Sequence, residues 1–136
     1  MSQVKAFTVG AKTYNAAMVS AVKQDELLSM LTAPLTQRAL AAAQVGKVVG
    51  DELVSGMLMS MEYSIKSKIA DMLMTQVFIA GTQVPVTIDD FSGRMVEYNQ
   101  LLARLLMWNL GDFSQWLSSV VAPDATQPQP PENIVL

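Results

Sequence analysis

The stretch TIDDFSGRMVEYNQLLARLLMWNLGDFSQWLSSVV, from Thr87 to Val121, decides the fold of this chain. Thr87 and Asp90 have the spacing of a capping box, which predicts the start of a helix. Beyond it, apolar side chains recur at alternating four- and three-residue steps and so form one helical stripe. Gly111 is predicted to stop this helix, which then spans residues 89–110. The stripe consists of Phe91, Met95, Tyr98, Leu102 and Leu105.

A second, shorter helix is predicted after Gly111. Asp112 can cap it and Pro123 ends it. A helix of this length is not stable alone, so its apolar face must pack against something. It either closes the domain's own core, which is slightly favoured, or offers a landing site for a partner. The apolar face consists of Phe113, Trp116, Leu117 and Val120.

The rest of the chain predicts an α+β fold that is predominantly α-helical, with an N-terminal β-hairpin followed by a small helical bundle with two long helices. Apolar periodicity and turn residues define these elements. Pro34 is predicted to end a helix, and Pro85 confines its strand to a sheet edge. In order, the predicted elements are strands 4–9 and 12–18, helices 20–33, 35–45 and 51–74, and a second hairpin over 76–79 and 83–88.

The chain divides into one globular domain, residues 1–122, and a Pro-rich tail, residues 123–136. The tail holds four of the six prolines and no aromatic residue. Such a composition favours an extended, flexible segment that brings little burial, so we expect the tail to be dispensable for folding.

The composition excludes several kinds of chemistry. There is no cysteine and no histidine, which removes thiol nucleophiles, disulfides, imidazole bases and the usual zinc ligands. Hydrophobic residues make up 51% of the chain and charged residues 15%. This balance predicts self-association, which light scattering would reveal as a particle larger than 14.8 kDa. No signal peptide and no membrane span are predicted, so we expect a soluble cytoplasmic protein.

Charge is distributed unevenly along the chain. Residues 1–70 carry a net charge of +2 and residues 71–136 a net charge of −5. A solvated acidic face is the simplest interpretation, and steering of a basic partner is the functional one. Neither half holds a cluster of lysine and arginine with interleaved aromatic residues, so we expect no nucleic-acid binding.

No catalytic motif is present, and we expect neither an enzyme nor a bound cofactor or metal. Gly46-Lys47 lacks the other residues of a phosphate-binding loop. The acidic pairs Asp51-Glu52 and Asp89-Asp90 stand where helices start, where carboxylates stabilise the helix dipole. The serines have no histidine to activate them.

The helix predicted over residues 51–74 is rich in methionine. Methionine fills irregular cores, and it is also common on surfaces that accept several partners. Met59 lies off the main apolar stripe and is the residue of this helix that we assign to a partner surface. The full set of candidate partner-binding residues is Met59, Trp108, Phe113, Trp116, Leu117 and Val120.

Two segments carry a resemblance to a known family. FTVGAKTYNAAMVSAVKQDELLSML, residues 7–31, looks like the opening of the tail assembly chaperones of long-tailed phages. VEYNQLLARLLMWNLGDFSQWLSSVV followed by APDATQPQPP, residues 96–131, resembles the end of the lambda-type minor tail protein G. Size, acidity and the order of the helices also fit, so the likeness extends over most of the chain.

The resemblance implies a non-enzymatic role in the host cytoplasm. Such chaperones bind the long, helical tape-measure protein and keep it soluble while tail-tube protein polymerises around it. Many are made in two forms by a ribosomal frameshift. The chain is then expected to bind tape-measure and tail-tube proteins and to form a homo-oligomer. Two other classes remain open: a secretion-type chaperone and a structural tail-completion protein of the virion.

Overall fold

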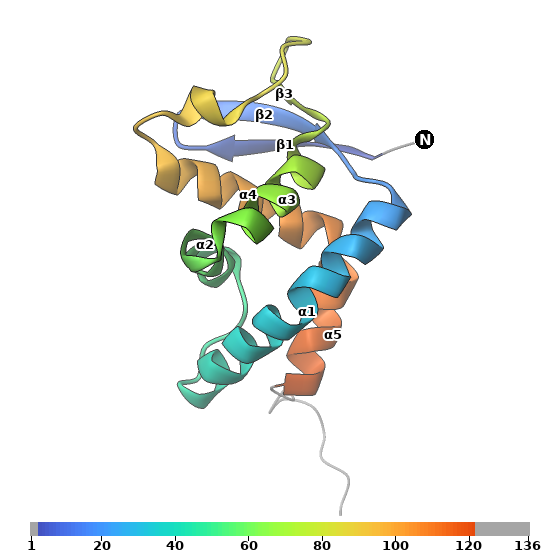
Figure 1. The fold of residues 1–136 in the computed structure, drawn as a ribbon, viewed down its shortest axis with the longest axis vertical. Helices are drawn as coiled ribbons and strands as arrows, with labels where there is room; N and C mark the ends of the chain where they lie inside the picture. The colour runs from blue at the N-terminus through green and yellow to red at the C-terminus, as the bar shows by residue number, and fades with distance from the viewer. Residues whose placement is uncertain (1–2, 122–136) are drawn as a thin grey trace, which may run out of the picture.

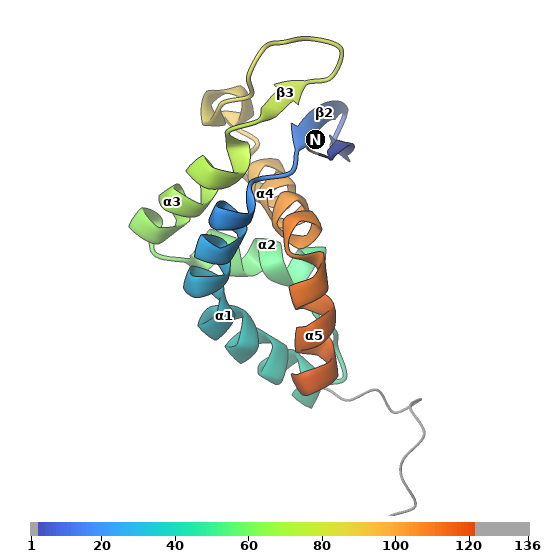
Figure 2. The ribbon, with the colours of Figure 1, turned by 90° about the vertical axis from the view of Figure 1, so that its right-hand side faces the viewer.

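The computed structural model describes residues 3–121, which form an α+β protein that is predominantly helical. A small antiparallel sheet lies at one end, and the α-helices extend from one side of it (Figures 1 and 2). The predicted fold class is confirmed. The predicted tail, residues 123–136, lies outside the described residues. The elements are β1 (Val4–Val9), β2 (Lys12–Ala17), α1 (Ala21–Gln44), α2 (Asp51–Ser60), α3 (Tyr63–Met74), β3 (Val77–Ile79), the 3₁₀ helix η1 (Ile88–Phe91), α4 (Met95–Asn109) and α5 (Gly111–Val121).

The sheet has the strand order β1-β2-β3, and both pairs are antiparallel. The N-terminal hairpin is confirmed, and its inner face is buried at Phe7, Val9 and Tyr14. The second predicted hairpin is much reduced. After β3 the chain turns and makes only an isolated bridge between Phe78 and Pro85. The bonds to β3 come from Val84 and Val86 on either side of Pro85, so the missing N–H of this proline faces the outer edge.

The tight turn of the first hairpin depends on Gly10, whose φ is 61°. A Cβ there would also meet the Glu97 carboxyl group at 2.7 Å. We therefore expect Gly10→Ala to lower the free energy of unfolding by about 1–2 kcal/mol, measured by denaturant titration. The control is Gly56→Ala inside α2, where a Cβ has open space. This second change should raise stability by roughly 0.5–1 kcal/mol, and equal effects of the two substitutions would contradict the prediction.

Helix α1 runs straight through Pro34, so the prediction that this proline ends a helix was wrong. The apolar stripe continues without a phase change on both sides of Pro34, and its side chains are buried. Burial of several leucines outweighs the roughly 3 kcal/mol that an internal proline costs. The buried residues of the stripe are Leu27, Leu31, Leu35, Ala39 and Ala42.

The helix predicted over residues 51–74 is in fact two helices, α2 and α3. Met61 and Glu62 between them have extended backbone angles, with ψ of 154° and 134°. The buried faces of α2 and α3 both pack against α4, and α2 also contacts α1. One straight helix would carry the Ile65 side chain on the buried stripe, whereas Ile65 is exposed.

The helix predicted over residues 89–110 starts later than expected. The capping box at Thr87 and Asp90 is present, but it caps the short helix η1. Gly93, with φ of 79°, then turns the chain before α4 begins at Met95. This turn separates Phe91 from the helical stripe, while Met95 keeps its spacing to Tyr98 but, as the first residue of α4, is 42% exposed.

The predicted end of the helix at Gly111 is confirmed, although Gly111 lacks the positive φ usual for a glycine in this position. Leu110 caps α4, and Gly111 is the first residue of α5. Asp112 lies within the first turn of α5, and its carboxylate accepts a hydrogen bond from the Phe113 N–H at 2.7 Å. Helix α5 descends beside α1 toward the end of the molecule opposite the sheet (Figures 1 and 2).

Helix α4 is the centre of the core. Its leucines Leu101, Leu102, Leu105 and Leu106 are all buried. It is joined to the corner between β2 and α1 by Asn109, whose Oδ1 accepts a hydrogen bond from the Val19 N–H at 2.9 Å. Helices α2, α3 and α5, the short helix η1 and strand β1 therefore pack around α4, whereas α1 packs against α2 and α5.

Candidate partner-binding surfaces

The acidic pairs serve local structure. Asp51 and Glu52 occupy the first turn of α2, and the Asp90 carboxylate accepts a hydrogen bond from the Thr87 N–H at 2.9 Å. Within residues 3–121, no group of three or more acidic residues is placed to hold a metal ion. The candidate partner-binding features are therefore hollows in the surface and exposed apolar side chains.

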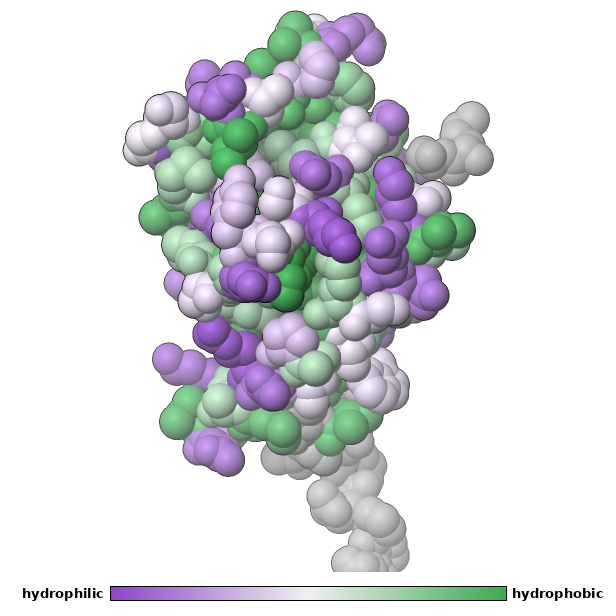
Figure 3. Space-filling view, viewed as in Figure 1, coloured by the Kyte–Doolittle hydropathy of each residue, from purple (hydrophilic) through white to green (hydrophobic). Residues whose placement is uncertain are grey.

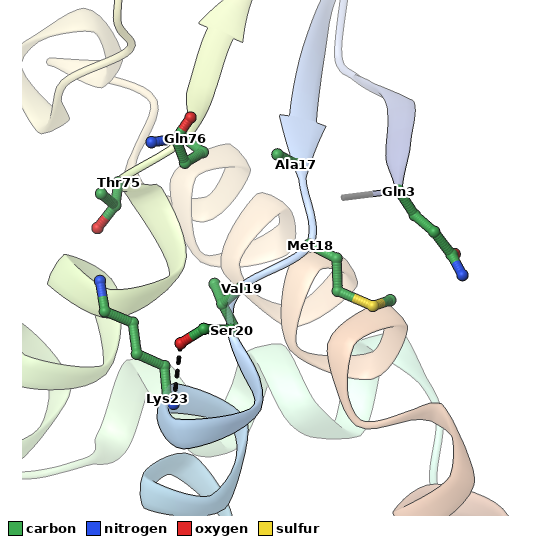
Figure 4. A pocket seen from close by; sticks show the side chains of 8 residues that line it. All are labelled: Gln3, Ala17, Met18, Val19, Ser20, Lys23, Thr75 and Gln76. Atoms are coloured by element: carbon green, nitrogen blue, oxygen red, sulfur yellow. Dashed lines mark hydrogen bonds between the residues drawn. The ribbon is translucent and has the colours of Figure 1, made fainter. Parts of the chain in front are cut away.

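One hollow, of about 640 Å³, lies at the corner where β2 meets α1 (Figure 4). Its polar groups are engaged in local structure. The Ser20 hydroxyl caps α1 by accepting from the Lys23 N–H at 3.4 Å, and the Gln76 carbonyl accepts from the Ala17 N–H. The Lys23 side chain points toward Thr75, whereas Gln3 and Met18 point the other way. These groups do not converge on one ligand.

The structure divides the apolar face predicted for α5. Phe113 and Leu117 are buried and close the domain's own core, as the slightly favoured interpretation holds. Trp116 and Val120 are 53% and 56% exposed. The Trp116 ring stacks on Phe113 with centroids 5.8 Å apart, so one of its faces contacts a core residue while half of the residue stays exposed. Only the two exposed residues are placed to meet a partner.

The other two candidate residues lie apart from α5's exposed face. Met59 is 47% exposed near the end of α2, where Ser60 accepts a hydrogen bond from Arg38 of α1. Trp108 is half-buried, and its ring meets Phe7 edge-on at 5.4 Å. The structure therefore does not gather the six predicted residues into one site.

A groove between α3 and α4 was not predicted from the sequence. It has a volume of about 600 Å³. Three apolar residues at its edges are well exposed: Tyr63 by 74%, Ile88 by 45% and Met95 by 42%. The signal available in the sequence was the methionine content, with Met74 and Met95 both lining the groove. The other lining residues are Lys66, Ser67, Ala70, Asp71, Val86, Thr87 and Tyr98.

The surroundings shift the pKa values of two titratable groups in this groove. Burial lowers the pKa of the Lys66 ammonium group. Burial, followed by the charges of Asp71 and Tyr63, raises the pKa of the Tyr98 hydroxyl. Both shifts reflect the partial burial of these two side chains in the wall of the groove. Lys66 has no salt-bridge partner among residues 3–121, so its charge is available to an acidic group of a partner.

Apolar side chains also gather at the end of the molecule opposite the sheet, over the last turns of α1 (Figure 3). The exposed apolar residues at this end are Leu40, near the end of α1, and Val45 and Val48 in the loop after it. Helix α5, which carries Trp116 and Val120, packs against α1. This end of the domain therefore adds a second exposed apolar region to the α3–α4 groove.

No helix in the described part of the chain combines the length and apolar character needed to cross a bilayer. No family model, no curated protein and no solved structure matches this chain.

Proposed function

We propose that this protein is a tail assembly chaperone of a long-tailed phage. It binds tape-measure protein in the host cytoplasm, keeps that protein soluble and promotes polymerisation of tail-tube protein, without catalysing a reaction. The observation that carries the proposal is the α3–α4 groove, which is bordered by the exposed apolar side chains of Tyr63, Ile88 and Met95. A groove of this kind suits the apolar face of an amphipathic helix.

The composition of the groove fits a partner whose sequence varies along its length. Methionine has a flexible, polarisable side chain that adapts to differently shaped apolar surfaces. Tyrosine supplies large contact area at a low cost in side-chain entropy. A chaperone that meets many successive turns of a long helical protein needs adaptable contacts of this sort rather than one shape-specific pocket.

The groove is tested by co-expressing the full chain with the tape-measure protein of the same phage and measuring soluble tape-measure protein. Met95→Glu places a charge in the groove and should weaken capture by roughly tenfold or more. Val96→Glu is the matched control, because Val96 is the adjacent residue of α4, is 56% exposed and does not line the groove. Equal capture by the two variants would contradict the proposal.

The same phage and the same assay also test the two alternative functions, a structural tail-completion protein and a secretion-type chaperone. A structural tail-completion protein would be retained in purified, mature virions, whereas an assembly chaperone should be absent from them. A secretion-type chaperone would leave the solubility of tape-measure protein unchanged. Mass spectrometry of virions and the co-expression assay therefore distinguish all three functions.

The exposed part of α5 gives a second prediction. We expect Trp116→Ala to leave the melting temperature nearly unchanged and to abolish partner capture or oligomers, because half of the ring is exposed. Leu117→Ala, one residue on, removes a side chain that is 1% exposed and should cost about 2–5 kcal/mol of unfolding free energy. A loss of similar size in Trp116→Ala would show that Trp116 belongs to the core.

A further inference from the structure

One edge of the sheet is covered by a neighbouring segment, whereas the other edge is open. Beyond β3, the segment at Val84–Val86 covers the edge, since Ile79 donates to the Val84 carbonyl and Val86 donates to the Val77 carbonyl, both at 3.0 Å. Strand β1 forms the other edge, and within residues 3–121 it pairs only with β2. An uncovered edge strand is a template for another extended segment.

The register shows which backbone groups of β1 face outward. The Gln3 carbonyl accepts from the Met18 N–H across the hairpin, so alternate residues from Gln3 onward face β2. Val4, Ala6 and Thr8 therefore direct their N–H and carbonyl groups away from the sheet. Arg104 confirms this orientation, because its guanidinium donates to the Thr8 carbonyl from outside. Among residues 3–121, no other protein group bonds these outward positions.

A hollow of about 510 Å³ runs along this edge. Its lining includes four consecutive residues of β1, from Lys5 to Thr8, whose side chains alternate between the two faces of the sheet. The hollow therefore follows the strand's edge rather than one face. Its far wall comes from α4, where Trp108 and Met107 supply apolar surface. An edge strand beside an apolar wall is the arrangement by which domains bind extended peptides.

The charges at this edge define the chemistry of the occupant. Arg104 has one acidic neighbour, Asp51, at 3.7 Å, and both side chains are about half exposed. Lys5 lies over the Phe7 ring at 5.5 Å and has no salt-bridge partner in the described part of the chain. The hollow thus carries two cationic groups and one carboxylate, although the chain as a whole has a net charge of −3.

We propose that β1 and the hollow beside it bind an extended, acidic and apolar segment of a partner protein, which adds to the sheet as a further strand. The segment's backbone bonds the outward N–H and carbonyl groups of Val4 and Ala6 and the N–H of Thr8, whose carbonyl already accepts from Arg104. Side chains two residues apart on a strand share one face of the sheet, as Lys5 and Phe7 do. On the added segment, a carboxylate therefore lies opposite Lys5, and the next side chain on the same face is apolar and lies opposite Phe7, against Trp108. This surface is separate from the α3–α4 groove and does not depend on the proposed function.

A second copy of this chain fits the same edge less well. A two-fold antiparallel pairing of β1 with itself, centred on Ala6, would place the Lys5 side chains of both copies on one face, two residues apart in register. Diagonal neighbours on one face of a sheet are within reach of long side chains, so the two ammonium groups repel each other. An acidic segment instead gains from both Lys5 and Arg104.

The test uses the full chain and two synthetic peptides blocked at both ends. The first peptide contains threonine, valine, threonine, glutamate and threonine, and the second has lysine in place of glutamate. The Trp116→Phe variant leaves Trp108 as the sole tryptophan, so fluorescence titration reports the hollow directly. We expect the acidic peptide to bind about tenfold more tightly than the lysine peptide, and to slow amide hydrogen exchange at Ala6 and Thr8.

Ala6→Pro, made in the Trp116→Phe protein, separates backbone pairing from simple charge attraction. It removes an outward N–H and leaves the β1–β2 ladder intact, as proline is tolerated on the open side of an edge strand. It should keep the melting temperature and weaken peptide binding about tenfold or more, whereas the control Ala6→Val should bind normally. Should Ala6→Pro fail to fold, the exchange rates at Ala6 and Thr8 decide the question alone.

Four results would overturn the proposal. The first three are no binding of the acidic peptide, binding without slower exchange at Ala6 and Thr8, and equal binding by a folded Ala6→Pro protein. A fourth is slower exchange at these amides as the protein concentration rises without peptide, which would identify a second copy as the occupant.

Discussion

Phe91→Ala should lower the free energy of unfolding by about 3–5 kcal/mol, the range for loss of a buried aromatic ring. The Phe91 side chain is fully buried. Its ring lies between Tyr14 of β2, at 5.6 Å, and Tyr98 of α4, at 5.4 Å between centroids. The ring therefore joins the sheet to the central helix, and its removal opens a cavity that both elements border. Denaturant titration measures the loss directly.

The control for this prediction is Ile88→Ala, on the same short helix. Ile88 is 45% exposed, and exposed substitutions usually change stability by less than about 0.5 kcal/mol. If Phe91→Ala and Ile88→Ala destabilise equally, then the helix η1 itself, rather than the aromatic contact, determines the effect. That result would contradict the role assigned to Phe91.

Asn109→Ala should cost about 2–4 kcal/mol, although it removes only a small polar side chain. The Asn109 amide is buried, accepts from the Val19 N–H at 2.9 Å and donates to the Leu105 carbonyl at 2.8 Å. Alanine leaves the Val19 N–H buried without a partner, which alone costs about 1–3 kcal/mol. The lost packing of the side chain adds to this cost.

Asn99 provides a close comparison, since it lies ten residues earlier on α4 and is 2% exposed. Its amide nitrogen donates to the Met95 carbonyl, but its Oδ1 has no hydrogen-bond partner among the described residues. Asn99→Ala removes that unsatisfied oxygen, so it should destabilise the protein much less than Asn109→Ala. Equal losses in chemical denaturation would show that packing, rather than hydrogen bonding, determines both effects.

The sequence predicted elements well where the signal is local. The N-terminal hairpin needs only β-favourable residues around Gly10, and the capping box at Thr87 needs only two side chains. Helix continuity was harder to predict. Whether Pro34 ends a helix depends on how much apolar surface lies beyond it, and whether residues 61–62 break one depends on which helices surround them. Tertiary packing decides both cases.

The candidate surfaces could also be predicted only in part, because they depend on tertiary packing. The apolar face of α5 was recognised, but only the fold shows that Phe113 and Leu117 point inward while Trp116 and Val120 point outward. The α3–α4 groove joins residues about 30 positions apart, from Tyr63 to Met95, and no local pattern marks such a pairing. The open edge of β1 also depends on strand order, which periodicity does not determine.

The bonds that attach the hairpin and its corner to α4 have a consequence for synthesis on the ribosome. Arg104 bonds Thr8 across 96 residues, and Asn109 bonds Val19 across 90. At roughly 5–20 residues per second, α4 follows the hairpin by about 5–20 seconds. Throughout that period the apolar face of the nascent hairpin has no helix to cover it. Slow codons between residues 20 and 95 would prolong this exposure, so they should lower the yield of folded protein.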